Sequence, residues 1–124
     1  YKTYVWPTPS PIDSLAYVTM DFMDYNEPAD IVVFYNVLYH LKNPWGALEH
    51  VRALTKEALC FQTSCAPGNE PALRLYKKYE GHPKDPTVYQ RPTIPGALLL
   101  LERCGFPNRE VFGNWGDHIV LKAW

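Results

Sequence analysis

The stretch Asp30–Leu41 reads Asp-Ile-Val-Val-Phe-Tyr-Asn-Val-Leu-Tyr-His-Leu, and it decides the fold class. Residues 31–34 are apolar and do not alternate with polar residues, which is typical of a strand covered on both faces. In open α/β sheets, ligand sites collect just beyond the carboxyl ends of such strands. The polar and aromatic residues at that position here are Tyr35, Asn36, Tyr39 and His40.

The residues that follow predict a helix and a second strand. Asn43 can cap a helix and Pro44 is favoured at its first position, while the apolar residues from 45 to 54 recur at helical spacing and predict an end near Thr55. Residues 58–63 form a second apolar run. Residues 30–63 therefore predict a strand–helix–strand unit of the length of a right-handed parallel crossover.

Prolines and glycines divide the rest of the chain into separate segments. Prolines at positions 7, 9 and 11 predict an extended arm or linker over residues 1–14, so that residues 15–124 form the domain. A short strand is expected over residues 15–20 and a loop over residues 21–29. Residues 64–92 predict a long loop, such as a lid or binding loop, with a short helix from Pro71 to Tyr79 capped by Asn69.

The C-terminal part predicts one more helix and a hairpin. Thr93 can cap a helix that includes residues 97–101, and Gly105-Phe106 fits a helix stop. Residues 110–113 and 118–124 flank a turn, which predicts two antiparallel strands. The order of elements indicates an α/β fold that ends in an antiparallel pair.

Composition limits the class of protein. The chain has 124 residues, enough for one domain, and its net charge of −1 with no basic block argues weakly against a nucleic-acid partner. Three cysteines without metal-ligand spacing give no disulfide framework and no metal site, so the reducing cytosol (a cytoplasmic location) is the simplest setting. No apolar run is long enough to span a bilayer. The start at Tyr1, without Met, is expected of a processed chain or one cut from something longer.

Several motifs in this order resemble the C-terminal half of a class I S-adenosylmethionine-dependent methyltransferase. The closest resemblance is to the family related to the tRNA wobble-uridine methyltransferases and carboxymethyltransferases. The matching segments are Asp30-Ile31-Val32-Val33, Val37-Leu38-Tyr39-His40, Asn43-Pro44, Val88-Tyr89-Gln90-Arg91-Pro92-Thr93 and Cys104-Gly105-Phe106. The resemblance covers residues 15–124 and implies a partial Rossmann-like methyltransferase fold, with its C-terminal strands, helices and terminal hairpin.

The resemblance also implies S-adenosyl-L-methionine as cofactor, with one important departure. Such enzymes hold the cofactor's methionine part on a Gly-rich turn after the first strand, and no Gly-x-Gly occurs in this sequence. Positions carried over from the family place Asp21 and Phe22 near the adenine, and Tyr35 and Asn36 along the cofactor. The alternatives are a solvated loop acid for Asp21 and simple burial at a strand end for Tyr35 and Asn36. For Asp30 the resemblance implies a structural role at the start of the strand.

The resemblance implies roles in catalysis or in binding of the methyl acceptor for four other residues. His40 can act as a general base and Tyr39 can face the acceptor, although a lone histidine is more often a hydrogen-bonded structural residue. Tyr89 and Arg91 fall where the family positions acceptor-side residues, and Arg91 can bind a carboxylate or phosphate with two donors. The alternative for Arg91 is a solvated loop arginine.

Two functions follow from these expectations. The first is methyl transfer to a small-molecule acceptor, or less favourably to tRNA, by a methyltransferase-like domain that another segment completes. The second is a non-catalytic binding or assembly module derived from a methyltransferase. A sheet cut in the middle would expose a strand edge, which invites pairing. We therefore expect a homodimer, strand exchange, or a complex with a missing N-terminal half.

Overall fold

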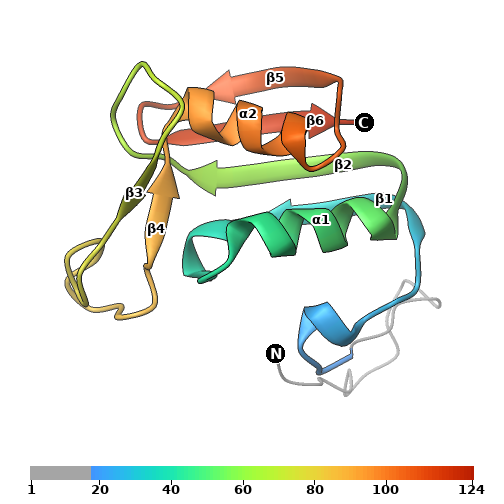
Figure 1. Cartoon of the computed structure of the whole chain (residues 1–124), viewed down its shortest axis with the longest axis horizontal. Coiled ribbons are helices and arrows are strands. Elements are labelled where there is room, and N and C mark those ends of the chain that lie inside the picture. Colours follow the sequence, from blue (N-terminus) through green and yellow to red (C-terminus); the bar gives the residue numbers. More distant parts are fainter. Residues whose placement is uncertain (1–17) are drawn as a thin grey trace, which may run out of the picture.

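The computed structural model describes residues 18–124, and the prediction of an arm over residues 1–14 lies outside them. Figure 1 shows a sheet with helices packed on it and a separate arm made by β3 and β4. The elements are η1 (Phe22–Asp24), β1 (Ala29–Tyr35), η2 (Leu38–His40), α1 (Pro44–Leu54), β2 (Thr55–Ser64), β3 (Leu73–Leu75), β4 (Gln90–Pro92), α2 (Ile94–Arg103), β5 (Arg109–Asn114) and β6 (His118–Ala123).

The main sheet has the strand order β1-β2-β6-β5. Strand β1 is parallel to β2, and β6 is antiparallel to both of its neighbours, so the last two strands form the predicted hairpin. Helices α1 and α2 lie on the same face of the sheet (Figure 1). The core between them and the sheet is made by Phe34, Leu38, Leu48, Val51, Leu59, Phe61, Cys65, Ala97, Leu100, Leu101, Cys104, Phe106, Ile119, Leu121 and Ala123.

The ends of both helices confirm the predicted capping residues. Asn43 Oδ1 accepts the Gly46 N–H at 3.0 Å at the start of α1, and Thr93 Oγ1 accepts the Gly96 N–H at 3.1 Å at the start of α2. At the end of α2, Gly105 has a φ of 107°, a left-handed value that suits glycine. The Phe106 N–H then donates to the Leu101 carbonyl at 3.0 Å and closes the helix.

The prediction that both faces of residues 31–34 are covered is wrong. Ile31, Val33 and Tyr35 are 51%, 61% and 45% exposed, because the helices cover only the opposite face of β1. In the part of the chain that the structure describes, strand β1 is also an edge of the sheet and pairs with β2 alone. Exposed apolar side chains on an edge strand form a surface that another element normally covers.

The predicted helix from Pro71 to Tyr79 is also wrong. Residues 73–75 form β3, which pairs antiparallel with β4 in a separate two-stranded sheet. Extended backbone is held there by tertiary contacts, since the Ala72 N–H donates to Thr93 Oγ1 at 3.1 Å and the Thr93 N–H donates to the Ala72 carbonyl at 2.9 Å. These long-range bonds override the local preference for a helix.

The segment before β1 differs slightly from expectation. Within the part of the predicted strand 15–20 that the structure describes, residues 18–20 are not in a strand. The predicted loop over residues 21–29 contains the single turn η1, and β1 begins at Ala29.

Candidate functional site

The candidate site lies at the carboxyl ends of β1 and β2, where the arm β3–β4 extends from the sheet (Figure 1). Strand β1 ends at Tyr35, and Asn36 follows with a φ of 58°, in the left-handed region that asparagine tolerates better than most residues. The Asn36 N–H donates to the Gln62 carbonyl of β2 at 2.8 Å. This turn sends the chain into η2, which carries Tyr39 and His40.

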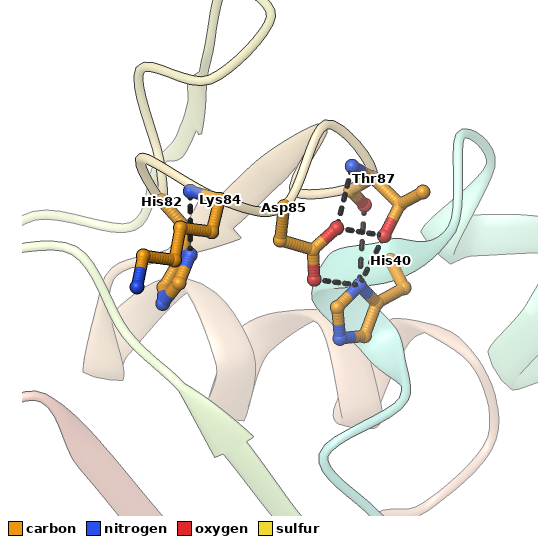
Figure 2. Close-up of polar contacts among 5 residues, drawn as sticks. All are labelled: His40, His82, Lys84, Asp85 and Thr87. Carbon is orange, nitrogen blue, oxygen red and sulfur yellow. Dashed lines mark hydrogen bonds and ion pairs between the residues drawn. The ribbon is translucent and has the colours of Figure 1, made fainter.

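His40 is held by the loop that precedes β4. Its Nδ1 lies 2.9 Å from Thr87 Oγ1 and 3.3 Å from the Thr87 carbonyl oxygen, and 3.7 Å from Asp85 Oδ2 (Figure 2). The Thr87 hydroxyl donates its own hydrogen to Asp85 Oδ1. Since all groups around Nδ1 then act as acceptors, Nδ1 carries a hydrogen and donates it.

This arrangement fixes the chemistry of the other ring nitrogen. With the hydrogen on Nδ1, a neutral His40 presents a free lone pair on Nε2, and that atom makes no hydrogen bond within residues 18–124. The side chain is 33% exposed, so Nε2 can meet a ligand. The geometry is therefore that of a general base whose tautomer is set by an acidic partner.

The loop itself supports this tautomer. The pKa of Asp85 is lowered from its ordinary value, first by the hydrogen bond from the Thr87 side chain, then by the Thr87 backbone N–H, and to a lesser degree by His40 and His82. His82 lies in the same loop, but its Nδ1 accepts the Lys84 N–H at 3.1 Å and does not face His40 (Figure 2). Asp85 is therefore ionised at neutral pH and can hold the His40 ring.

The structure brings together the four residues predicted for catalysis and acceptor binding. The Tyr39 and His40 rings lie 4.3 Å apart, and the Arg91 guanidinium lies 5.8 Å from the centre of the Tyr39 ring. The Tyr89 N–H donates to the Tyr39 carbonyl at 3.0 Å. Residues far apart in the sequence thus form one cluster at the end of the sheet.

Five residues of this cluster were missed by the sequence analysis. Asp85 and Thr87 contact His40, Tyr76 contacts Arg91, Lys42 contacts Tyr89, and Arg74 contacts Tyr76. The pattern Asp85-Pro86-Thr87 is a signal for a side-chain turn, and the Thr87 N–H does donate to Asp85 Oδ1 at 2.8 Å. Sequence could have predicted that turn, but nothing in the sequence of the long loop indicates that it meets His40.

Asp21 and Phe22, predicted to lie near an adenine, belong to a separate segment that packs on α1. Asp21 Oδ1 accepts the Met23 N–H at 3.0 Å, as the cap of η1. The Phe22 ring lies 5.9 Å from the rings of Phe34 and His50, and His50 Nε2 donates to the Phe22 carbonyl at 2.9 Å. Asp30 lies exposed on the edge strand and makes no ion pair within residues 18–124.

A hollow of about 530 Å³ links this segment to the end of β1. It is lined by Phe22, Tyr25, Glu27, Ala29, Ile31, Val32, Val33, Phe34, Tyr35, Val37, Val51 and Leu54. Because its lining includes residues from both faces of β1, the hollow follows the free edge of that strand. Among the described residues no strand pairs with the N–H and C=O groups of this edge, and apolar side chains flank it, so the edge is suited to pairing with another strand.

Other kinds of site receive no support from the described residues. Among residues 18–124, no group of three or more histidine, cysteine or acidic side chains is placed to hold a metal ion. All three cysteines are free thiols. The helices of this part of the chain are too short or too polar to cross a bilayer.

Comparison with solved structures defines the class of fold. The N-terminal domain of EvdMO1, solved in the presence of SAH and D-fucose, superposes with a TM-score of 0.58 at 19% identity, over 85% of this chain and 50% of that chain. Human N-acetylserotonin methyltransferase in complex with SAM gives a TM-score of 0.59 at 17% identity, over 87% of this chain and 33% of that chain. The fold is that of part of a methyltransferase domain, with the C-terminal strands and the terminal hairpin.

A relative with a known name indicates which methyltransferases the chain resembles in sequence. The tRNA U34 carboxymethyltransferase of Aliarcobacter butzleri (strain RM4018) is 38% identical over 93 residues, which make up 73% of this chain and 30% of the relative. The chain thus spans less than a third of the length of that relative. No protein-family model matches the chain. The resemblance to the C-terminal half of a class I methyltransferase, predicted from the motifs, is confirmed.

Proposed function

We propose that this chain is the acceptor-side half of an S-adenosylmethionine-dependent methyltransferase, active when a cofactor-binding half completes the cleft. One observation carries this proposal: Tyr35, Asn36, Tyr39 and His40 lie at or just after the carboxyl end of β1, and within residues 18–124 the outer side of that strand is unpaired. Structures with the same fold are described with SAH or SAM, which supports this cofactor. The cofactor would supply a methyl group on a sulfonium, which is already a good leaving group.

The residues present fit one wall of such a cleft. Tyr35 and Asn36 lie at the strand end, with exposed side chains that can line the cofactor. Asp21 uses Oδ1 to cap η1, while its other oxygen makes no hydrogen bond within residues 18–124 and can accept an adenine amino group. The opposite wall needs a Gly-rich turn, and the sequence contains no Gly-x-Gly. We therefore assign to this chain one wall of the cofactor cleft and the positioning of the acceptor.

In the proposed reaction, the chain's own residues orient the acceptor and accept its proton. His40 Nε2, with Nδ1–H fixed by Thr87 and Asp85, is placed to take a proton from the attacking group. The Tyr39 ring next to it can pack against the acceptor, and Tyr89 and Arg91 extend the same surface. Positioning of this kind can supply a large part of the rate of a two-substrate transfer.

The acceptor is either a small molecule or tRNA. The net charge of −1 favours a small molecule, whereas the name of the Aliarcobacter relative favours uridine 34 of a tRNA. A second candidate function is a non-catalytic binding or assembly module, for which the exposed apolar face of β1, with Ile31 and Val33, offers a binding surface. Three free thiols support the reducing cytosol as the compartment.

The open edge and face of β1 indicate the kind of partner. We propose that they pair with the cofactor-binding half, or in its absence with a second copy of this chain, by association or strand exchange. The exposed Ile31 and Val33 and the apolar hollow along the edge support this proposal.

Calorimetric titration of the chain with S-adenosylmethionine and S-adenosylhomocysteine separates the two functions. Saturable heat that is lost in Asp21→Ala would support both the cofactor and the adenine position of Asp21. Asp24→Ala is the matched control, because it removes another exposed acid of the same turn. The absence of heat at millimolar ligand would exclude an autonomous methyltransferase, and its absence also after addition of a cofactor-binding half would favour the non-catalytic module.

A further inference from the structure

The arm β3–β4 places two arginines directly opposite each other. Arg74 and Arg91 are partners in the register of this two-stranded sheet, so their side chains leave the same face. Both guanidinium groups pack on one ring, with Arg74 at 5.0 Å and Arg91 at 5.2 Å from the centre of Tyr76. Like charges directly opposite each other destabilise a strand pair, so this arrangement carries a cost in the absence of an anion.

No acid of the described chain neutralises this pair. Within residues 18–124, no carboxylate oxygen lies within 4.0 Å of either guanidinium, and neither side chain donates a hydrogen bond to the protein. The Nε of Arg91 is buried without a hydrogen-bond partner. Asp117 is close enough for Arg91 to contribute to lowering its pKa, but that effect is the last of several, and Asp117 pairs with His118 at 2.9 Å.

A third cation and two further rings belong to the same surface. Lys42 Nζ lies 5.3 Å from the centre of the Tyr89 ring, and Arg91 also contacts Tyr39. Backbone bonds hold the three tyrosines together, since Tyr89 donates to the Tyr39 carbonyl and Tyr76 donates to the Tyr89 carbonyl, each at 3.0 Å. Tyr76 and Tyr89 also line a hollow of about 360 Å³ together with Lys78, Pro86, Thr87 and Val88.

We propose that Arg74, Arg91 and Lys42 form an oxyanion-binding site for a carboxylate or phosphate group. Rings that pack on a guanidinium keep its planar set of donors in place, so less rotamer entropy is lost when an anion binds. The free donors match the paired oxygens of a carboxylate or phosphate. A bound anion would also remove the repulsion between the two opposed arginines.

The site lies next to the candidate base, because Arg91 and His40 both contact the ring of Tyr39. We infer that the anion is part of the acceptor and that the site holds the acceptor with its reactive group towards His40. This role as an acceptor anchor rests on the proposed function, whereas anion binding itself does not. Anion binding can therefore be correct even if the role as acceptor anchor is wrong.

The test is calorimetric titration of the full chain with pyrophosphate and with malonate at low ionic strength, where screening is weakest. The variants are Arg74→Gln and Arg91→Gln, with Arg103→Gln as the matched control. Arg103 lies exposed in the last turn of α2, outside the cluster, and its replacement changes the net charge equally. Arg91→Lys keeps the charge and removes the planar donors.

Loss of one charge-assisted contact is expected to weaken binding roughly 10- to 100-fold in Arg74→Gln and Arg91→Gln, with a smaller loss in Arg91→Lys. Arg103→Gln should bind like the native chain. Preference for pyrophosphate would identify a phosphate ligand, and preference for malonate a carboxylate. Absence of saturable binding to both anions, or an equal loss in Arg103→Gln, would overturn the proposal. If Arg91→Gln does not fold, the anion affinities of Arg91→Lys and Arg74→Gln test the proposal.

Discussion

Replacing Val33 with lysine tests whether the open face of β1 is an association surface. Val33 lies between Ile31 and Tyr35 on the face that the helices leave uncovered, and about half of each side chain is exposed. Full burial of such a side chain contributes about 1.5–3 kcal/mol, so covering the exposed parts of all three contributes roughly 3 kcal/mol, or a factor of about 150 in the dissociation constant.

Val33→Lys removes one third of this gain and places a charge in the interface. A loss of at least about 2 kcal/mol is expected, which weakens self-association roughly 30-fold. The matched control is Leu75→Lys, since Leu75 is 76% exposed on the arm, away from the main sheet. Sedimentation velocity over a wide range of protein concentration measures both variants.

The expected result is concentration-dependent association of the native chain and of Leu75→Lys, with a large shift towards monomer in Val33→Lys. A native chain that stays monomeric at the highest concentration would show that this face of β1 is not an association surface. So would an equal shift in Leu75→Lys, because general charge repulsion would then explain the effect.

Two further predictions concern stability and the thiols. Thr93→Val removes the hydroxyl that caps α2 and accepts the Ala72 N–H, so thermal unfolding should show a loss of about 1–2 kcal/mol, a melting temperature lower by roughly 3–12 °C, while Thr93→Ser should stay near the native value. Burial first, and then Asp117 for Cys65 and Glu49 for Cys104, raises the pKa of each thiol from 9.0 to about 11. Iodoacetamide should therefore modify both more slowly at pH 9 than the partly exposed Cys60, as mass spectrometry can measure. Because the unfolded thiols ionise at lower pH than the folded ones, their contribution to stability is complete below pH 9 and is lost as the pH rises towards 11. Fast modification of Cys65, or flat stability over that range, would contradict this reading.

Much of the fold could be predicted because local signals and tertiary structure agree. The Asn43-Pro44 start, the Thr93 cap and the Gly105 stop each satisfy backbone groups that every helix leaves free. These signals act within a few residues, so they can be read from the sequence alone. The parallel pair β1–β2 and the final hairpin follow from the same local patterns.

The covering of β1 could not be predicted from its own residues. An unbroken apolar run shows that a strand is suited to burial on both faces, but it does not show whether the covering element is present. Ile31 and Val33 are therefore apolar, as in a strand that is buried on both faces, but they are exposed because no described element covers that face. The sequence pattern fits a larger sheet than the one that residues 18–124 form.

The candidate site was predicted in part for a similar reason. The end of β1 marked Tyr39 and His40, because sites collect at the carboxyl ends of parallel strands. Arg91 was predicted as an anion-binding residue, but its neighbour Arg74 was missed, because the two arginines are far apart in the sequence and meet only when β3 pairs with β4. The absence of a basic block therefore does not exclude a local pair of cations.

Nuclear magnetic resonance of the labelled chain during titration with S-adenosylhomocysteine tests whether the carboxyl end of β1 is one wall of a cofactor cleft. We expect weak, dose-dependent shifts at the backbone groups of Tyr35, Asn36 and Tyr39, with none along α2 and β5. Shifts confined to other parts of the chain, or no shift at the end of β1 at millimolar ligand, would contradict this assignment.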